Sequence, residues 1–362
     1  MPQTLSVIKA DVGGWVGHGA VHPELLAHAS EALALAVQAG SVIDAQAHAC
    51  GDDLVLILSH ERAEDDQAVH RLAWETFASG AELARRLGLH GAGQDLRVDA
   101  FPGNIRGTGP GSAELTFEER SSEPVVVFMS DKTAAGAFNL PMYRAFADPF
   151  NTPGLVMSEA LHQGFGFEVH DRKERRKVML TTPDEAYGLL GLIGAPSRFV
   201  VKRVVSRLTN EVAATCSIGE GAQLGGYAAE DDPCAIVRCQ GNFPAVGEVL
   251  EPFTTPWLVL GSMRDSHYAP WMPVAEAQAH PSRFDGPPRV VALGFQLHEG
   301  RLGLARDLFD DPGFDRARAA ANRTMDLMRA HGPFEPHLGA LDDGERAGLP
   351  GVTSLDTRWT RA

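Results

Sequence analysis

Several aspartates of this chain adjoin apolar runs that are typical of buried strands. They are Asp11, Asp52, Asp53, Asp131, Asp231 and Asp232. A carboxylate beside buried surface costs on the order of several kcal/mol unless it is paired, hydrogen-bonded or bound to a metal. Asp52 and Asp53 also follow Gly51, and a glycine permits a tight bend or the close approach of a ligand. The chemistry of the chain therefore depends on what neutralises these acids.

Clustered carboxylates repel one another unless cations lie between them. If the strand ends meet at one edge of a sheet, the aspartates converge, with His18 and Gln94 nearby on glycine-rich loops. Oxygen-rich sets of this kind suit Mg²⁺ or Mn²⁺, and such sites commonly serve phosphoryl chemistry. The spacing leaves an alternative open, that these are ordinary solvated loop acids.

Candidate partners for a phosphate group are also present. Lys132 directly follows Asp131, Arg264 lies in a loop with Ser266 and His267, and Gly103 with Asn104 offers backbone N–H groups. Taken singly, each of Lys132 and Arg264 favours the interpretation of an ordinary surface charge. Three further aspartate pairs, at 65–66, 310–311 and 342–343, favour helix capping or solvated turns.

The composition narrows the classes of function. The 362 residues include 47 acidic and 32 basic ones, for a net charge of -15, which argues against nucleic acid or an anionic membrane as the main partner. The cysteines show no C-x-x-C spacing and are typical of free thiols in a reducing cytoplasm; they are Cys50, Cys216, Cys234 and Cys239. We see no signal peptide and no apolar run near 18 residues, so we expect a cytoplasmic protein.

Hydrophobic periodicity and turn residues predict the elements that position the acids. The expected strands include 5–10, a hairpin of 42–50 with 54–59, and 125–129. The expected helices are 23–39, 65–87, 183–193 and 314–330, and 139–154 is expected to be an ordered loop. We find no internal repeat or low-complexity linker, so we predict one α/β unit over residues 1–362.

Long stretches of the chain resemble the archaeal and bacterial fructose-1,6-bisphosphate aldolase/phosphatase family. The matching stretches include SVIKAD (6–11), GDDL (51–54), AGQDL (92–96), GN-x-RG (103–107), DKT (131–133), FADPFNTPGLV (146–156), DDP (231–233), SHY-x-P (266–270), RFDGPPR (283–289) and DLFDDP (307–312). Ordered matches of this length are far more specific than a short motif.

The resemblance implies a single-domain, multilayer α/β sandwich with central mixed or antiparallel sheets, a homo-octamer and several Mg²⁺ ions per active site. The implied metal ligands are Asp11, His18, Asp52, Asp53, Gln94, Asp131, Asp231 and Asp232. The implied contacts to a phosphosugar substrate are His18, His90, Gly103, Asn104, Lys132, Gln240, Arg264 and Asp285.

The chain departs from the family pattern at three positions that would touch the substrate. In the family, a Tyr-x-x-Lys-Asp-Asp-Pro stretch supplies a proton-moving tyrosine and a Schiff-base lysine. Here Tyr227 is present, but Glu230 occupies the lysine position, and a carboxylate cannot form an imine. Glu230 either orients a metal ion or points into solvent. Two family tyrosines align with His90 and Arg346.

These observations predict a Mg²⁺-dependent phosphatase that hydrolyses the 1-phosphate of fructose 1,6-bisphosphate in gluconeogenesis, without Schiff-base aldolase activity. One alternative is a phosphatase or lyase for another sugar phosphate on the same scaffold. The other is a non-catalytic homologue that binds a phosphosugar. In each case the partner is a small phosphosugar rather than nucleic acid or a membrane.

Overall fold

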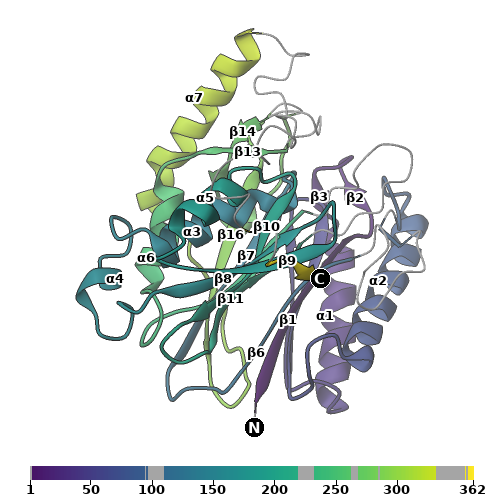
Figure 1. Cartoon of the computed structure of the whole chain (residues 1–362). Helices are drawn as coiled ribbons and strands as arrows, with labels where there is room; N and C mark the ends of the chain where they lie inside the picture. Colours follow the sequence, from purple (N-terminus) through teal and green to yellow (C-terminus); the bar gives the residue numbers. More distant parts are fainter. Residues whose placement is uncertain are drawn as a thin grey trace.

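Two β-sheets stacked face to face form the centre of the protein (Figure 1). The computed structural model describes residues 2–93, 95–96, 110–218, 232–261, 268–283, 286–331, 355 and 358–362. The smaller sheet has the order β4 (Asp44–Cys50), β5 (Asp53–His60), β1 (Gln3–Asp11), β6 (Gly111–Phe117). All its strand pairs are antiparallel, and the predicted hairpin is confirmed as β4 and β5.

The larger sheet runs across the second layer. Its order is β15 (Met272–Pro273), β16 (Arg289–Leu297), β7 (Glu123–Asp131), β12 (Cys234–Arg238), β11 (Val212–Cys216), β10 (Phe199–Ser206), β8 (Phe165–Asp171), β9 (Arg176–Thr181), β18 (Thr360–Arg361), with β17 (Arg306–Asp307) on β16. Only the β15–β16 pair is parallel among these described pairs. Two short ribbons complete the strands, β2 (Gly14–Trp15) with β3 (Ala20–Val21) and β13 (Leu258–Leu260) with β14 (Tyr268–Pro270).

Helices cover both outer faces of the sheet pair (Figure 1). The α-helices are α1 (Pro23–Gln38), α2 (Gln67–Leu87), α3 (Asn139–Ala147), α4 (Gly154–Met157), α5 (Ala186–Ile193), α6 (Val246–Leu250) and α7 (Asp315–His331). Short 3₁₀ helices are η1 (Ala135–Phe138), η2 (Glu251–Thr254), η3 (Glu276–Gln278) and η4 (Pro312–Phe314). Apolar residues of α1 and α2 pack on the smaller sheet, and those of α3 and α5 pack on the larger one. The expected α/β sandwich is confirmed. None of the described helices is long and apolar enough to cross a membrane.

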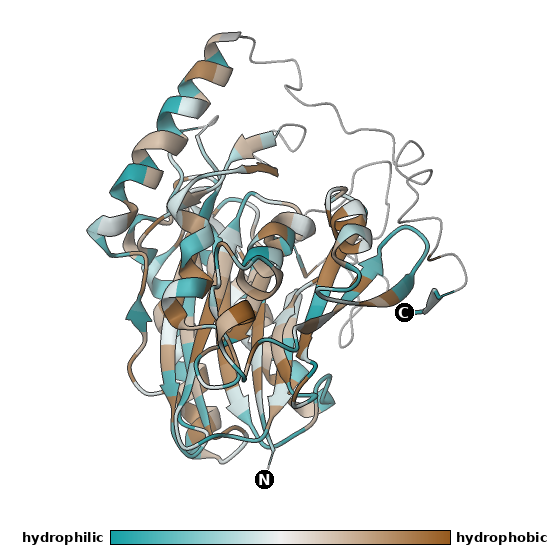
Figure 2. Ribbon diagram, turned by 60° about the vertical axis from the view of Figure 1, so that its left-hand side comes forward, coloured by the Kyte–Doolittle hydropathy of each residue, from teal (hydrophilic) through white to brown (hydrophobic). Residues whose placement is uncertain are grey.

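Strand alternation explains the three apolar layers, because successive side chains point to opposite faces. In β1, Leu5 and Val7 face the layer between the sheets, whereas Ile8 faces the helices α1 and α2. In β7, Val127 lies between the sheets and Phe128 faces the α3 side. Figure 2 shows much of the brown, hydrophobic colour on the strands at the centre of the molecule. The alternation decides which face each functional residue at a strand end takes.

Helix α3 corrects part of one prediction, because residues 139–147 of the expected ordered loop are helical, whereas residues 148–153 form a turn before α4. Pro141 falls in the first turn of α3, where a missing N–H is tolerated. Asn139 holds this helix to α5 and to β10 of the larger sheet by donating to the carbonyls of Ile193 and Phe199 and accepting from the backbone N–H of Val201. These contacts thus stabilise a helix in a segment whose prolines and aromatic residues suggested a loop.

A buried polar network joins the smaller sheet to α2. The Glu114 carboxylate accepts hydrogen bonds from the Ser6 hydroxyl and the backbone N–H of Asp65, and it lies 3.1 Å from Nε2 of His70. Burial alone would raise the pKa of Glu114, but its hydrogen bonds, above all that with His70, lower the pKa to about 2. The ionised carboxylate therefore stabilises the fold.

We expect Glu114→Gln to lower the free energy of unfolding by about 2 kcal/mol at pH 7, because a buried, charge-assisted network loses its central acceptor. A carboxyl whose folded pKa is depressed contributes stability above its unfolded pKa and loses it as pH falls toward the folded value. The difference in the free energy of unfolding between the variant and the wild type should therefore decrease as the pH falls from about 4.5 to about 2. Urea unfolding across that range tests this, with the exposed Glu61→Gln as control. A difference that is constant with pH would contradict it.

Candidate active site

The aspartates that adjoin apolar runs meet at one end of the layer between the two sheets. Asp11 and Asp53 are directly paired in the β1–β5 register, and Asp131 ends β7. By alternation each shares its face with residues of the middle apolar layer, such as Val7 and Val127. The strand ends therefore bring together carboxylates that are far apart in the sequence.

Two sets of side chains in this cluster are close enough to share a cation. Within each set, one potential ligand atom per residue lies within 4.8 Å of the others. The first set is Asp11, His18 and Asp52, and the second is Asp53, Asp131 and Asp232. The predicted convergence of these six residues is thus present. We call them, together with Asp95, the acidic cluster.

Gly51 explains how Asp131 approaches the β4–β5 turn so closely. Its φ of 62° lies in the left-handed region, and a Cβ at this position would overlap the Asp131 carboxyl group. The turn is anchored because the Gly51 N–H donates to the Ala279 carbonyl at 2.8 Å. Gly51 therefore has both of the roles that the sequence suggested, because it permits a tight bend and the close approach of Asp131.

His18 lies on the turn between β2 and β3 and reaches the cluster from the solvent side. Its Nδ1 is 3.3 Å from Oδ2 of Asp52. The His90 ring packs edge-on against it, with centroids 4.1 Å apart, and paired backbone hydrogen bonds between Gly14 and His90 hold the two segments together. His90 therefore stands at the rim of the site.

Two lysines contact the cluster from different sides. The Lys9 ammonium, almost wholly buried, donates to Asp53 and lies 3.5 Å from the Ser130 carbonyl. Lys132 donates to Oδ1 of Asp52 at 2.7 Å and lies 3.4 Å from Oδ1 of Asp131, with 19% of its side chain exposed. The two ammonium groups only partly balance the carboxylates around them.

The carboxyl groups of the cluster have raised pKa values, because they are buried and their negative charges are only partly balanced. Burial first, and then the neighbouring Asp52 and Asp53, raises the pKa of Asp11 to about 9. Burial likewise raises the pKa of Asp53 to about 7, although Lys9 opposes the rise, and holds the pKa of Asp131 well above its usual range. Carboxyl groups in this state favour a proton or an added cation.

Asp131 gives the sharpest sign of a cation site. It is fully buried, and neither carboxylate oxygen accepts a hydrogen bond from any described residue. Oδ2 of Asp52 is also buried without a hydrogen bond among the described residues. Hard oxygen ligands left unsatisfied in this way fit a divalent ion such as Mg²⁺.

Comparison with known proteins identifies the family of this chain. A profile of the fructose-1,6-bisphosphatase family matches residues 3–360. This chain belongs to that family. Relatives named fructose-1,6-bisphosphate aldolase/phosphatase are 54% identical in Ignicoccus hospitalis (96% of this chain, 90% of the relative), 51% in Methanothermobacter marburgensis (97% of each) and 54% in Thermococcus kodakarensis (96% and 95%).

Asp95 is a member of the acidic cluster that the sequence reasoning did not select. Its Oδ2 accepts the backbone N–H of Asp11 at 2.8 Å, and burial raises its pKa. The residue belongs to the AGQDL stretch that resembles the fructose-1,6-bisphosphatase family, directly after Gln94. Its place in that stretch was the available signal, but no apolar run adjoins it.

Gln240 lies elsewhere in this family member. It follows the Arg238 end of β12, and its carbonyl accepts from Arg120 at 2.7 Å, beside the first residue of β7, Glu123. Asp131 is at the other end of that nine-residue strand, so the separation is roughly 25 Å at about 3.3 Å per residue. Because β12 leads away from the acidic cluster, Gln240 does not reach the acidic cluster of its own chain.

Other predicted residues fall outside the described part of the chain. These are Gln94, Gly103, Asn104, Tyr227, Glu230, Asp231, Arg264, Asp285 and Arg346. The positions that the structure does describe cover most of the expected metal ligands and the lysine expected to contact phosphate.

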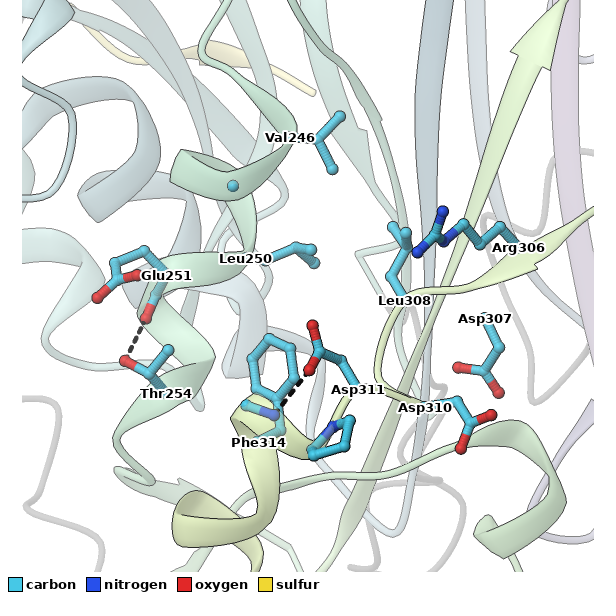
Figure 3. Close-up of a pocket in the computed structure, with 13 residues that line it drawn as sticks. Val246, Leu250, Glu251, Thr254, Arg306, Asp307, Leu308, Asp310, Asp311 and Phe314 are labelled. Atoms are coloured by element: carbon cyan, nitrogen blue, oxygen red, sulfur yellow. Dashed lines mark hydrogen bonds between the residues drawn. The ribbon is translucent and has the colours of Figure 1, made fainter.

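A separate pocket of about 660 Å³ lies between α6 with η2 and the segment 306–314 (Figure 3). Leu250, Leu308 and Phe314 contribute apolar surface. Its carboxylates Asp307 and Asp311 already accept backbone N–H groups, at 2.6 Å from Glu276 and 2.7 Å from Gly313. These acids stabilise turns, and the pocket shares no residue with the acidic cluster.

Proposed function

We propose that this protein is a Mg²⁺-dependent phosphatase that hydrolyses the 1-phosphate of fructose 1,6-bisphosphate to give fructose 6-phosphate, as a step of gluconeogenesis. The carboxylate of Asp131 carries the proposal, because it is fully buried, accepts no hydrogen bond from any described residue, and is the kind of hard oxygen ligand that suits a divalent cation. Membership of the fructose-1,6-bisphosphatase family supports the choice of substrate. Mn²⁺ suits the same oxygen-rich ligands.

The residues that would hold the ions are Asp11, His18, Asp52, Asp53, Asp131 and Asp232. When bound, a divalent ion supplies positive charge to phosphate oxygens and activates water. Lys132 stands at the exposed edge of the acidic cluster and has three N–H donors for the phosphoryl group. Lys9 holds Asp53 from the buried side, and the apolar layer behind the cluster excludes water there.

A direct assay tests the function. Phosphate release should be fastest with fructose 1,6-bisphosphate among a panel of sugar phosphates, should require Mg²⁺ or Mn²⁺, and should stop when EDTA removes the metal. The position of His90 against His18 favours a second candidate, a phosphatase for a different sugar phosphate, since His90 takes the place of a tyrosine expected at the substrate. A faster rate with another sugar phosphate would support that candidate. Binding without release would indicate a phosphosugar-binding homologue.

We further propose that the Schiff-base aldolase activity is absent, because Glu230 offers no amine. Borohydride treatment with dihydroxyacetone phosphate should therefore leave every lysine unmodified, as judged by mass spectrometry. Lys9 is the amine nearest to the acidic cluster in the buried layer, and its ion pair with Asp53 keeps it protonated. A trapped adduct on any of the five lysines would contradict this prediction.

The assembly and compartment implied by the resemblance are also proposals for this chain. We infer a homo-octamer in the cytoplasm. Light scattering after size exclusion would give the mass directly, and any mass other than eight chains of 38.8 kDa would contradict the octamer.

A further inference from the structure

We propose that Lys132 is a displaceable internal cation, which occupies the acidic cluster until divalent ions load and is then released to bind the substrate phosphate. The inference rests on the proposed function only in that it takes the acidic cluster to be a divalent-cation site. It concerns the order of events at that site and the reason for the placement of Lys132.

The contacts of Lys132 join the two halves of the acidic cluster. Its ammonium is 2.7 Å from Asp52, which belongs to one potential ligand set, and 3.4 Å from Asp131, which belongs to the other. One positive charge therefore takes up oxygens that both sets would offer to ions. Cations that share these ligands compete with the ammonium by charge and by contact.

The backbone around Lys132 is held, so any displacement must come from its side chain. Lys132 has a φ of 61°, an uncommon conformation for a non-glycine residue. The next residue fixes this turn, because the Thr133 N–H donates to Asp232 at 2.6 Å and Thr133 pairs with Gly261 across a β-bridge. The conformation places Asp131, Lys132 and Asp232 around one point.

Lys9 shows what a permanent cation looks like in the same site. Only 3% of its side chain is exposed, and it contacts Asp53 from within the middle layer. The Lys132 side chain is 19% exposed and approaches from the side that solvent reaches. A flexible four-carbon stem lets such an ammonium move between neighbouring anions without any change in the backbone.

The proposal predicts the sign of a change in metal affinity. We expect Lys132→Met to bind Mn²⁺ alone, without substrate, about tenfold more tightly than the wild type, because a competing charge is removed and two carboxylates are freed. Inorganic phosphate should tighten Mn²⁺ binding to the wild type and have little effect on Lys132→Met. Isothermal titration or electron paramagnetic resonance of Mn²⁺ measures both effects.

Controls separate this effect from a structural one. Lys177→Met also removes a lysine paired with a carboxylate, Glu168 at 3.6 Å, but far from the acidic cluster along the larger sheet, and it should leave Mn²⁺ affinity unchanged. Lys132→Gln provides a second variant should the first fold poorly. In the wild type, Mg²⁺ should increase the rate at which an acetylating reagent modifies Lys132, measured by mass spectrometry.

Unchanged or weaker Mn²⁺ binding by folded Lys132 variants would overturn the proposal, as would a Lys132 acetylation rate that does not respond to Mg²⁺. The metal titration uses no sugar phosphate, so its result is independent of the phosphatase assay. Tighter binding in a protein that releases no phosphate would retain this inference and refute the proposed function. Phosphate release by the wild type, together with unchanged Mn²⁺ affinity in the Lys132 variants, would refute this inference and retain the proposed function.

Discussion

Asp131→Asn is expected to abolish phosphate release while making the metal-free protein more stable. The variant keeps the shape of the side chain but loses the charge, so a hard oxygen ligand is weakened. We expect turnover to fall on the order of 10³-fold, equivalent to about 4 kcal/mol in the transition state. In the absence of metal, the same change removes a buried carboxyl group that accepts no hydrogen bond from any described residue.

The gain in the free energy of unfolding without metal should be about 1–3 kcal/mol, because burial disfavours the charged carboxylate and asparagine has no charge. Thermal or urea unfolding with EDTA measures it, and Mg²⁺ should stabilise the wild type more than the variant. Turnover within tenfold of the wild type at saturating Mg²⁺ would exclude Asp131 from the site.

Asp171→Asn is the matched control, since Asp171 is equally buried but ends β8 in another part of the larger sheet. Its Oδ2 accepts hydrogen bonds from Arg176 and Arg198, and its Oδ1 accepts one from Arg198. Its substitution removes the charged partner that both arginines contact and should destabilise the protein by about 2–4 kcal/mol, with turnover retained. The two variants should therefore change stability and activity in opposite ways.

Gly51→Ala is expected to remove activity through the backbone rather than through a ligand. A methyl group at this position overlaps the Asp131 carboxyl, so either the β4–β5 turn or Asp131 must move. We expect turnover to fall more than about 100-fold, since a displacement of about 1 Å can cost that much. The free energy of unfolding should fall by about 2–4 kcal/mol from left-handed strain and overpacking.

Gly40→Ala isolates the cost of the left-handed backbone conformation from the cost of overpacking. Gly40 has a similar φ of 71°, but no atom outside its chain neighbours lies within 4 Å of the added methyl. It should cost about 1 kcal/mol and leave turnover unchanged. Steady-state kinetics and urea unfolding of both variants test the comparison. Equal losses in the two would show that backbone conformation, not the approach of Asp131, makes Gly51 necessary.

Local pattern was sufficient to predict the elements that carry the acids. Helix α2 illustrates this, because the Asp66 side chain caps its first turn and Gly88 ends it in the left-handed conformation. The strands before Asp11 and Asp131 were equally clear, since alternating or continuous apolar residues mark a buried strand wherever the chain later places it. Period and capping depend on neighbours only a few residues apart.

Which strand ends meet was decided by the tertiary structure. Asp11 faces Asp53 across a strand pairing, and Asp131 joins them only because the two sheets stack with that end in common. The same stacking places Gln240 at the far end of β12. The sequence pattern therefore predicted the convergence of the aspartates, whereas the position of Gln240, a substrate contact that only the family resemblance implied, depends on how the strands are arranged.

The two lysines and Asp95 show why the sequence alone did not predict which groups meet. Lys9 pairs with Asp53 and Lys132 with Asp52, across 44 and 80 residues of sequence. Asp95 accepts a hydrogen bond from Asp11 across 84 residues. Charge compensation acts over a few ångströms in space, whereas residue type and spacing report order along the chain. The sequence determined which groups are available, and the packing of the two sheets decided which of them neutralise one another.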